Sequence, residues 1–178
     1  MKKVWKWVIA IVILIIIFLM LYKPKENYFD RIELSKDNAI INRTEIKFLD
    51  TILKVGLDEL GLKTIIISVR NITIKSDVPD LDLRAHILVS RESPNVYLLE
   101  IKKDHRSTVI KNLSHELIHL QQFNSGELRF GKDYLIWKGD TLHKQNIPNY
   151  EDREWELDAV SKGKLLEVRI KNRLYQLQ

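Results

Sequence analysis

The chain has 178 residues, of which 45% are hydrophobic and 30% are charged, with only 6 Gly and 4 Pro. This composition is typical of one globular domain with a short appendage, and it excludes low-complexity or extensively disordered protein. The formal net charge is +5, and the lack of cysteine excludes disulfides and thiolate ligands, so any metal site must use His, Asp and Glu.

The amino-terminal segment is long and apolar. Residues 4–22 read VWKWVIAIVILIIIFLMLY, in which Lys6 is the only charged residue. A helix of about 19 residues spans close to the roughly 30 Å of a bilayer core. Since no small-residue cleavage site follows, an uncleaved anchor is favoured over the alternative of a signal peptide. We therefore expect a single-pass transmembrane anchor over residues 1–25, and the excess of lysines before the span favours an extracytoplasmic domain over residues 26–178.

The next segments predict a helix and a strand. After a polar connector over residues 23–41, apolar residues recur at helical spacing over residues 42–62. Thr44 is the expected N-cap of this helix, and Gly61 the residue that ends it. Residues 63–74 are rich in β-branched side chains and predict a strand.

The middle of the chain predicts a hairpin. Residues 76–84 have the composition of a loop. Residues 85–90 and 95–103 predict two strands, joined by a turn that contains Ser-Pro-Asn.

The last third predicts a helix, short strands and a second helix. A helical pattern begins after Ser107, the expected N-cap, and stops at Gly126. Apolar and polar side chains alternate over residues 126–142, which contain a Lys-Gly-Asp turn, and this pattern predicts two short strands. From Tyr150 to the end the pattern is helical, and Gly163 could interrupt it. This order of elements is that of an α+β fold.

The segment LSHELIHLQQ, residues 113–122, carries the main chemical signal. Residues four apart on a helix project from one face, so His115 and His119 can bind one zinc ion through their imidazoles. In this HExxH spacing the carboxylate of Glu116 can act as general base toward a metal-bound water. The alternative is a structural helix whose histidines bond to backbone carbonyls.

A third ligand is expected downstream, because catalytic zinc usually has three protein ligands and a water. The segment NYEDREWELDAV, residues 149–160, is rich in carboxylates. Glu154, Glu156 and Asp158 are the candidates. The helix dipole stabilises carboxylates at the start of a helix, which is a sufficient explanation for Glu151 and Asp152.

With both motifs in view, the chain resembles zincin metallopeptidases of the gluzincin type, in which a glutamate on a later helix completes HExxH. It is more specifically similar to small bacterial zincins whose second motif reads Tyr, a few residues, then Pro-Trp/Phe-Glu-x-Glu-Ala. Tyr150 and the run WELDA, residues 155–159, match this pattern, and the resemblance extends over about residues 85–165. It implies a zincin-like fold, with helices and a small mixed sheet.

Two departures from that pattern leave the third ligand open. Glu154 stands where the family has proline, and Asp158 where it has the second glutamate. The resemblance implies Glu156 as the ligand, with Asp158 orienting a histidine or supporting the helix. A competing register, with the ExxxD spacing of larger gluzincins, makes Glu154 the ligand.

The resemblance also implies where substrate binds. In zincins the strand before the HExxH helix commonly lies at a sheet edge and pairs with extended peptide, and residues 95–103 would take that place. His143, in a polar loop, and Tyr150 are candidates to polarise the scissile carbonyl or stabilise the oxyanion. A surface histidine and a packed aromatic residue are the alternatives.

We therefore expect a membrane-anchored zinc metallopeptidase that acts on peptide or protein substrates near the membrane surface. The alternative is a membrane-tethered binding or assembly protein with a structural or vestigial zinc site. No nucleic-acid partner is expected, because the basic residues near the carboxyl end are interleaved with apolar ones at helical spacing.

Overall fold

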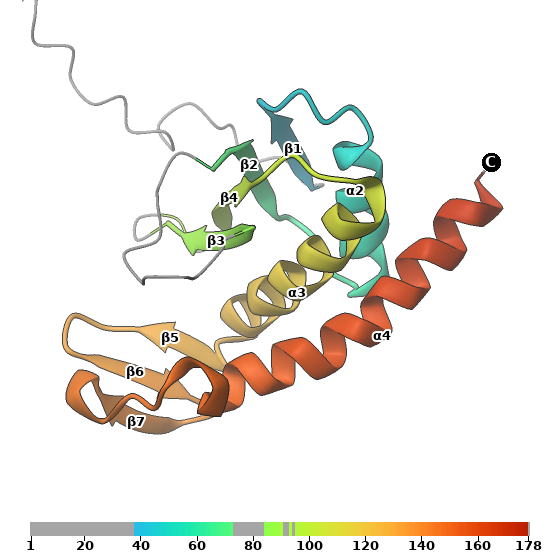
Figure 1. Cartoon of the computed structure of the whole chain (residues 1–178). Helices are drawn as coiled ribbons and strands as arrows, with labels where there is room; N and C mark the ends of the chain where they lie inside the picture. The colour runs from blue at the N-terminus through green and yellow to red at the C-terminus, as the bar shows by residue number, and fades with distance from the viewer. Residues whose placement is uncertain (1–37, 73–83, 91–92, 94, 178) are drawn as a thin grey trace, which may run out of the picture. The chain divides into compact units, whose positions relative to one another are not determined.

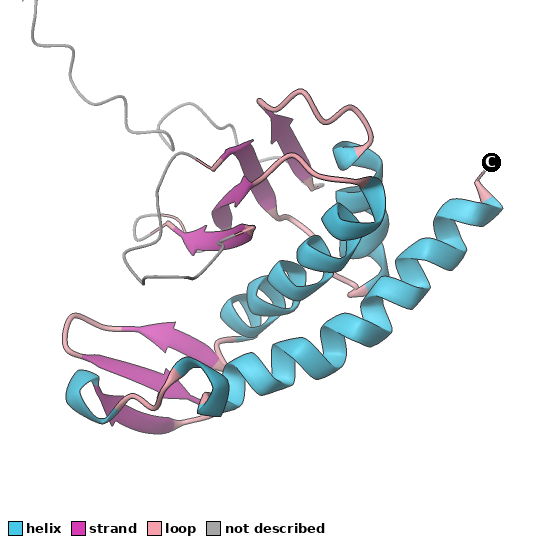
Figure 2. Cartoon of the chain, viewed as in Figure 1, coloured by secondary structure: helices cyan, strands magenta, loops and turns pink. Residues whose placement is uncertain are grey.

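The computed structural model describes residues 38–72, 84–90, 93 and 95–177. These residues all belong to a unit that spans Glu33–Gln178, and they form an α+β fold with a small mixed sheet and three α-helices (Figure 1; Figure 2). The expected α+β class is confirmed. The anchor predicted over residues 1–25 lies outside the described residues, and within them no helix is both long and apolar enough to cross a membrane.

The main sheet has four strands. They are β1 (Ala39–Asn42), β2 (Ile66–Asn71), β3 (Ala85–Val89) and β4 (Val96–Ile101), arranged in the order β1-β2-β4-β3. Strands β1, β2 and β4 run parallel, and β3 is antiparallel to β4. The predicted strand over residues 63–74 and the predicted hairpin are thus confirmed.

Two expectations about this sheet are wrong. β4 is not at an edge, because it is hydrogen-bonded to β2 on one side and to β3 on the other, which leaves β3 as the edge strand. β1 lies in the segment predicted as a connector. A strand of only four residues is too short for its alternation to be recognised, and its pairing with β2 is a tertiary contact.

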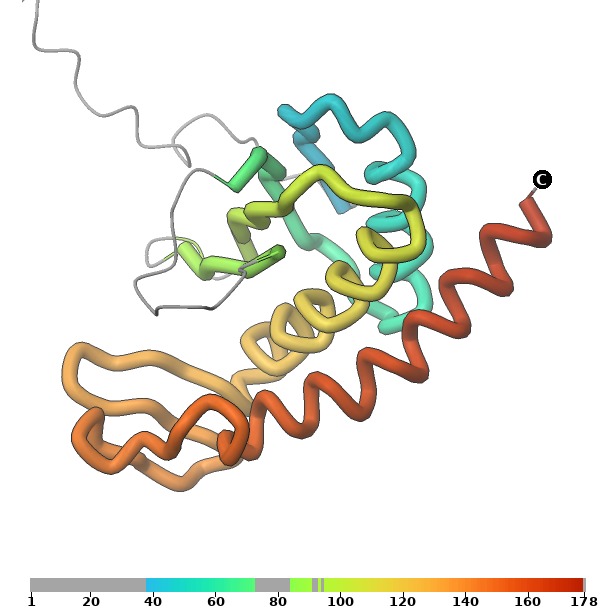
Figure 3. The backbone as a smooth tube through the Cα atoms, in the orientation of Figure 1, coloured from blue at the N-terminus to red at the C-terminus, as the bar shows by residue number. Residues whose placement is uncertain are grey.

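Three helices build the layers that cover the sheet. Figure 3 shows α2 (Leu49–Glu59) and α3 (Arg106–Ser125) next to the sheet, with α4 (Glu154–Gln176) lying across both helices. Side chains at alternate positions of β2 and β4 face α2 and α3 and form the main core: Ile67, Val69, Tyr97, Leu99 and Ile101. This layering gives α3 a sheet on one side and α4 on the other.

The predicted helix starts need correction. α2 begins at Leu49, and Thr44 instead accepts a hydrogen bond from the Ile46 N–H in a turn before the helix (3.1 Å). α3 begins at Arg106, so the predicted cap Ser107 lies inside it. Gly126 does end α3, with φ of 75°, a conformation that glycine adopts without steric cost.

A second, three-stranded antiparallel sheet follows α3. Its strands are β5 (Leu128–Phe130), β6 (Tyr134–Trp137) and β7 (Asp140–His143), one more than the two predicted. One face of this sheet buries Leu128, Leu135 and Trp137 against Trp155 at the start of α4. Two 3-10 turns, Lys144–Asn146 and Tyr150–Asp152, lead into α4.

α4 continues through Gly163 without interruption, and the reason is close helix packing. A Cβ atom at this position would lie 3.2 Å from the Cα of His115 and 3.4 Å from its backbone nitrogen. Glycine therefore lets the backbone of α4 approach the backbone of α3 at the level of His115. Two turns earlier on α4, the same approach brings Glu156 within reach of α3.

This close approach predicts a stability effect. Replacing Gly163 by Leu should lower the free energy of unfolding by about 1–3 kcal/mol, because the new side chain must separate the two helices. The measurement is urea denaturation of the full chain. Ser161→Leu, at an exposed position of the same helix, is the control and should change stability by no more than about 0.5 kcal/mol. Equal stability of the two variants would contradict the packing argument.

Candidate metal centre

α3 presents two histidines toward α4. His115 and His119 lie one helical turn apart, and their rings meet edge to face with centroids separated by 4.6 Å. His119 is buried, whereas His115 is partly exposed. Their Nε2 atoms are 3.0 Å apart, so both nitrogens point at one common location.

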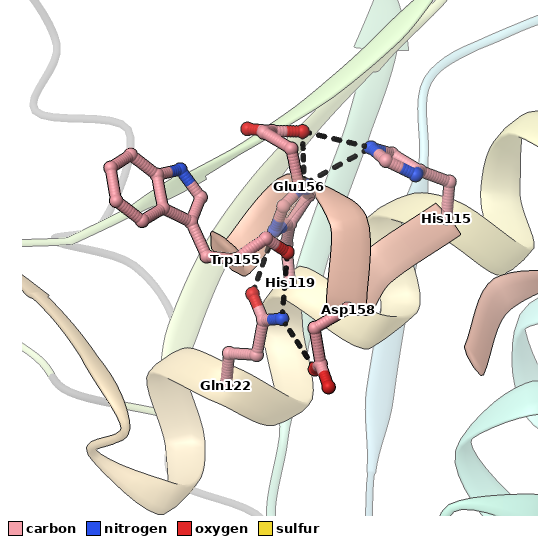
Figure 4. A network of polar contacts seen from close by, with 6 residues as sticks. All are labelled: His115, His119, Gln122, Trp155, Glu156 and Asp158. Carbon is pink, nitrogen blue, oxygen red and sulfur yellow. Dashed lines mark hydrogen bonds and ion pairs between the residues drawn. The ribbon is translucent and has the colours of Figure 1, made fainter. Parts of the chain in front are cut away.

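The carboxylate of Glu156 completes this group (Figure 4). Its Oε2 lies 3.2 Å from Nε2 of His119 and 3.4 Å from Nε2 of His115. Ligand atoms about 2.0–2.1 Å from a tetrahedral zinc ion lie about 3.3–3.4 Å from one another. The three donor atoms are thus spaced almost as a tetrahedral zinc site requires.

The donor set also fits zinc chemically, since two imidazole nitrogens and one carboxylate are the ligands of many catalytic zinc sites. His115, His119 and Glu156 form the only group of His, Asp or Glu side chains with such spacing among the residues that the structure describes. A site with three protein ligands leaves a fourth position for water or substrate. A closed structural site would need a fourth protein ligand.

Glu156 is held as a carboxylate. It lies in the first turn of α4, where the partial positive charge of the helix terminus stabilises an anion. Burial alone would raise its pKa, but hydrogen bonds with His115, His119 and Tyr150 hold the pKa of Glu156 well below its usual range. Glu156 is therefore deprotonated and able to bind a cation at neutral pH.

Glu154, the competing candidate, lies elsewhere. Its Oε2 accepts a hydrogen bond from the indole Nε1 of Trp137 at 2.9 Å. This contact ties the start of α4 to the three-stranded sheet. The geometry therefore favours the register with Glu156 as the third ligand, and it gives Glu154 a structural contact instead.

Gln122 is a site residue that the sequence reasoning missed. Its Nε2 donates to the carbonyl of Trp155 (3.0 Å) and to Oδ2 of Asp158 (2.9 Å), which fixes the orientation of the amide. Its Oε1 then faces Nδ1 of His119 at 2.8 Å. Because a carbonyl oxygen only accepts, Nδ1 of His119 must carry a proton, and Nε2 is the nitrogen available for metal.

Asp158 thus acts on His119 through Gln122. The expected role in orienting a histidine is indirect, because the Asp158 carboxylate contacts the Gln122 amide and the Lys162 ammonium. Burial would raise its pKa, but hydrogen bonds from Lys162 and Gln122 hold the pKa of Asp158 below its usual value. The sequence signal that could have identified Gln122 was its position, a polar residue three places after His119 on the helix.

Glu116 lies beside the two histidines and is almost wholly buried, with 7% of its surface exposed. Burial raises the pKa of its carboxyl, while His119 and His115 act in the opposite direction. The backbone N–H of Ile87, in the edge strand β3, donates a hydrogen bond to this carboxylate. The candidate base is therefore oriented by the sheet edge.

Tyr150 and His143 differ in their relation to the cluster. The Tyr150 hydroxyl is hydrogen-bonded to Glu156, and burial together with the nearby Glu156 and Glu116 carboxylates raises its pKa, so it remains a proton donor. His143 ends β7 with an exposed side chain. In the described part of the chain it makes no hydrogen bond or ion pair with the cluster, so its catalytic role stays a prediction.

No family model matches this chain, and neither the curated proteins nor the solved structures with which it was compared contain a match. The geometry of the site therefore carries the functional argument.

A matched pair of variants tests the third ligand. Glu156→Gln should reduce bound zinc from about one ion per chain to a small fraction, because it removes one of three ligands. Glu154→Gln should retain zinc, since its contact is with Trp137. Zinc content of the purified full chain, measured by mass spectrometry, distinguishes the two. Loss of zinc in Glu154→Gln alone would restore the competing register.

Replacing Gln122 by Met tests the hydrogen bond between Nδ1 of His119 and the Gln122 amide. The change keeps a side chain of similar length but removes all three hydrogen bonds, so zinc affinity should fall about 10–100-fold. Competition with a chelator of known affinity measures the change. Asp158→Asn is the milder control, because it retains an oxygen to accept from Gln122. An unchanged affinity in Gln122→Met would show that the amide does not orient His119.

Proposed function

We propose that this chain is a zinc-dependent metallopeptidase with a zincin-like fold. The observation that carries the proposal is the convergence of His115, His119 and Glu156 at the spacing of zinc ligands, with the buried carboxylate of Glu116 beside them. Zinc bound there would lower the pKa of a water molecule and polarise the carbonyl of a substrate.

Glu116 is the proposed general base. Burial raises the pKa of its carboxyl, while His119 and His115 act in the opposite direction, and a raised pKa helps a carboxylate to accept and return a proton. It would take a proton from the attacking water and deliver it to the amine that leaves. The N–H of Ile87 keeps the carboxylate in place for both transfers.

The sheet edge next to the site supports a peptide substrate. Two backbone hydrogen bonds fix which residues of β3 face β4. The N–H of Lys102 donates to the carbonyl of Arg84, and the N–H of Ser90 donates to the carbonyl of Val96. By antiparallel alternation, the backbone groups of residues 85, 87 and 89 face away from β4. The N–H of Ile87 contacts Glu116, and within the described residues the other groups of this edge are open to a partner strand. An extended peptide could add to this edge by β-strand pairing, so the substrate role expected for residues 95–103 passes to β3.

Tyr150 is proposed to stabilise the oxyanion. It remains protonated, and its hydroxyl already lies at the carboxylate of Glu156. A donor next to the ligands can reach negative charge that develops on a substrate oxygen bound there.

The alternative of a structural zinc site is less well supported. A structural site would use four protein ligands, and the described residues provide three in one group. We further propose that residues 4–22 tether the domain to a membrane on its extracytoplasmic side. Such a tether would limit the enzyme to substrates near the membrane surface.

Glu116→Gln is the decisive variant for this function. It should lower the rate of peptide hydrolysis by about 10²–10⁴-fold, because the amide cannot accept the proton, and it should leave zinc content unchanged. Cleavage of fluorogenic peptides by the zinc-loaded full chain, with a chelator as the second control, measures the effect. A parent chain that binds zinc but cleaves no peptide would argue for the structural alternative. A variant as active as the parent would rule out Glu116 as the general base.

A further inference from the structure

A groove of about 860 Å³ lies between the edge strand β3 and the three-stranded sheet. Ile87 and Val89 form part of one wall, and β5 with the turn after it forms part of the other. Ile87 is also the residue whose N–H contacts Glu116. Ile87 is therefore the residue that the groove and the proposed catalytic base share, and the groove follows the sheet edge from Ile87 to Ser90.

The surface of the groove is partly aromatic. Phe123, near the end of α3, and Phe130, at the end of β5, both line it, with ring centroids 5.7 Å apart. Phe130 is 64% exposed, in a three-residue strand of which only Leu128 is buried. An apolar side chain of a bound peptide would remove this ring from water.

Among the residues that the structure describes, the charged ones that line the groove are cationic: Arg129, Lys132 and Lys144. Nε of Arg129 donates to the carbonyl of Gly126 (3.1 Å), which holds its guanidinium in position. The backbone N–H of Lys144 donates to the carbonyl of Asp133 (3.1 Å), so Lys144 lies next to the turn that carries Lys132. Within the described residues, the structure records no ion pair for the ammonium group of either lysine.

We propose that this groove selects extended peptides that carry acidic side chains next to an apolar one, on one side of the bond to be cut. The inference rests on the proposed peptidase function and names its substrate class. Charge complementarity argues for acidic residues, because the described residues that line the groove include three cations and no carboxylate.

The test compares two fluorogenic peptides of one sequence that differ only in Glu or Lys beside a central Leu. The zinc-loaded full chain should cleave the Glu peptide with about tenfold higher kcat/KM, and the preference should weaken as salt is raised. Lys132→Glu combined with Lys144→Glu should abolish or reverse the preference. The control combines Lys54→Glu and Lys164→Glu, exposed positions on α2 and α4 that give the same change in net charge, and should keep it.

A second variant separates the aromatic contribution. Phe130→Ser should lower kcat/KM for both peptides while the ratio between them stays the same. If the parent cleaves both peptides equally well, the inference fails and the peptidase proposal stands. If the groove variant binds phosphatidylserine vesicles more weakly than the parent but keeps the peptide preference, these cations contact lipid and the inference is overturned.

The case in which no peptide is cleaved is also decisive. Fluorescence anisotropy then measures binding of the same two peptides to zinc-loaded Glu116→Gln. Tighter binding of the Glu peptide, lost when Lys132→Glu and Lys144→Glu are added, would support the groove even though the peptidase proposal had failed. Equal binding of the two peptides would overturn it.

Discussion

The arrangement of the site depends on one buried amide. Gln122 joins α3 to the start of α4 through the carbonyl of Trp155 and the carboxylate of Asp158, and it accepts from Nδ1 of His119. These contacts use both donors and an acceptor of the amide, which fixes its orientation. One residue therefore sets the tautomer of His119, a proposed metal ligand, and positions the first turn of the helix that supplies Glu156.

The packing of α4 explains the spacing of residues 155–159, the second motif. Trp155 is buried against Trp137 of the small sheet, and Ala159 is wholly buried against the main core. Glu156 and Asp158 lie between these two anchors and face α3. Gly163 then permits the close backbone contact at His115. Trp155, Glu156, Asp158 and Ala159 are thus each explained by a different contact of the same helix.

Part of this could be predicted from the sequence. The HExxH residues share a helix, so their proximity follows from helical geometry alone. Glu156 followed from the resemblance, and Glu154 remained a competitor because Glu154 and Asp158 also fit the ExxxD spacing of larger gluzincins. The edge position was assigned to residues 95–103 instead of β3, since the order of strands in a sheet depends on long-range pairing that alternation does not encode.

By itself, the sequence determined the α+β class, the helix that carries His115, Glu116 and His119, and the zinc chemistry that these side chains allow. All of these follow from contacts between residues close in the chain. Only the tertiary structure favoured Glu156 over Glu154, revealed Gln122, and formed the groove beside β3. The physical reason is that these features require α3, α4 and two sheets to pack together, and no local pattern determines how separate elements meet.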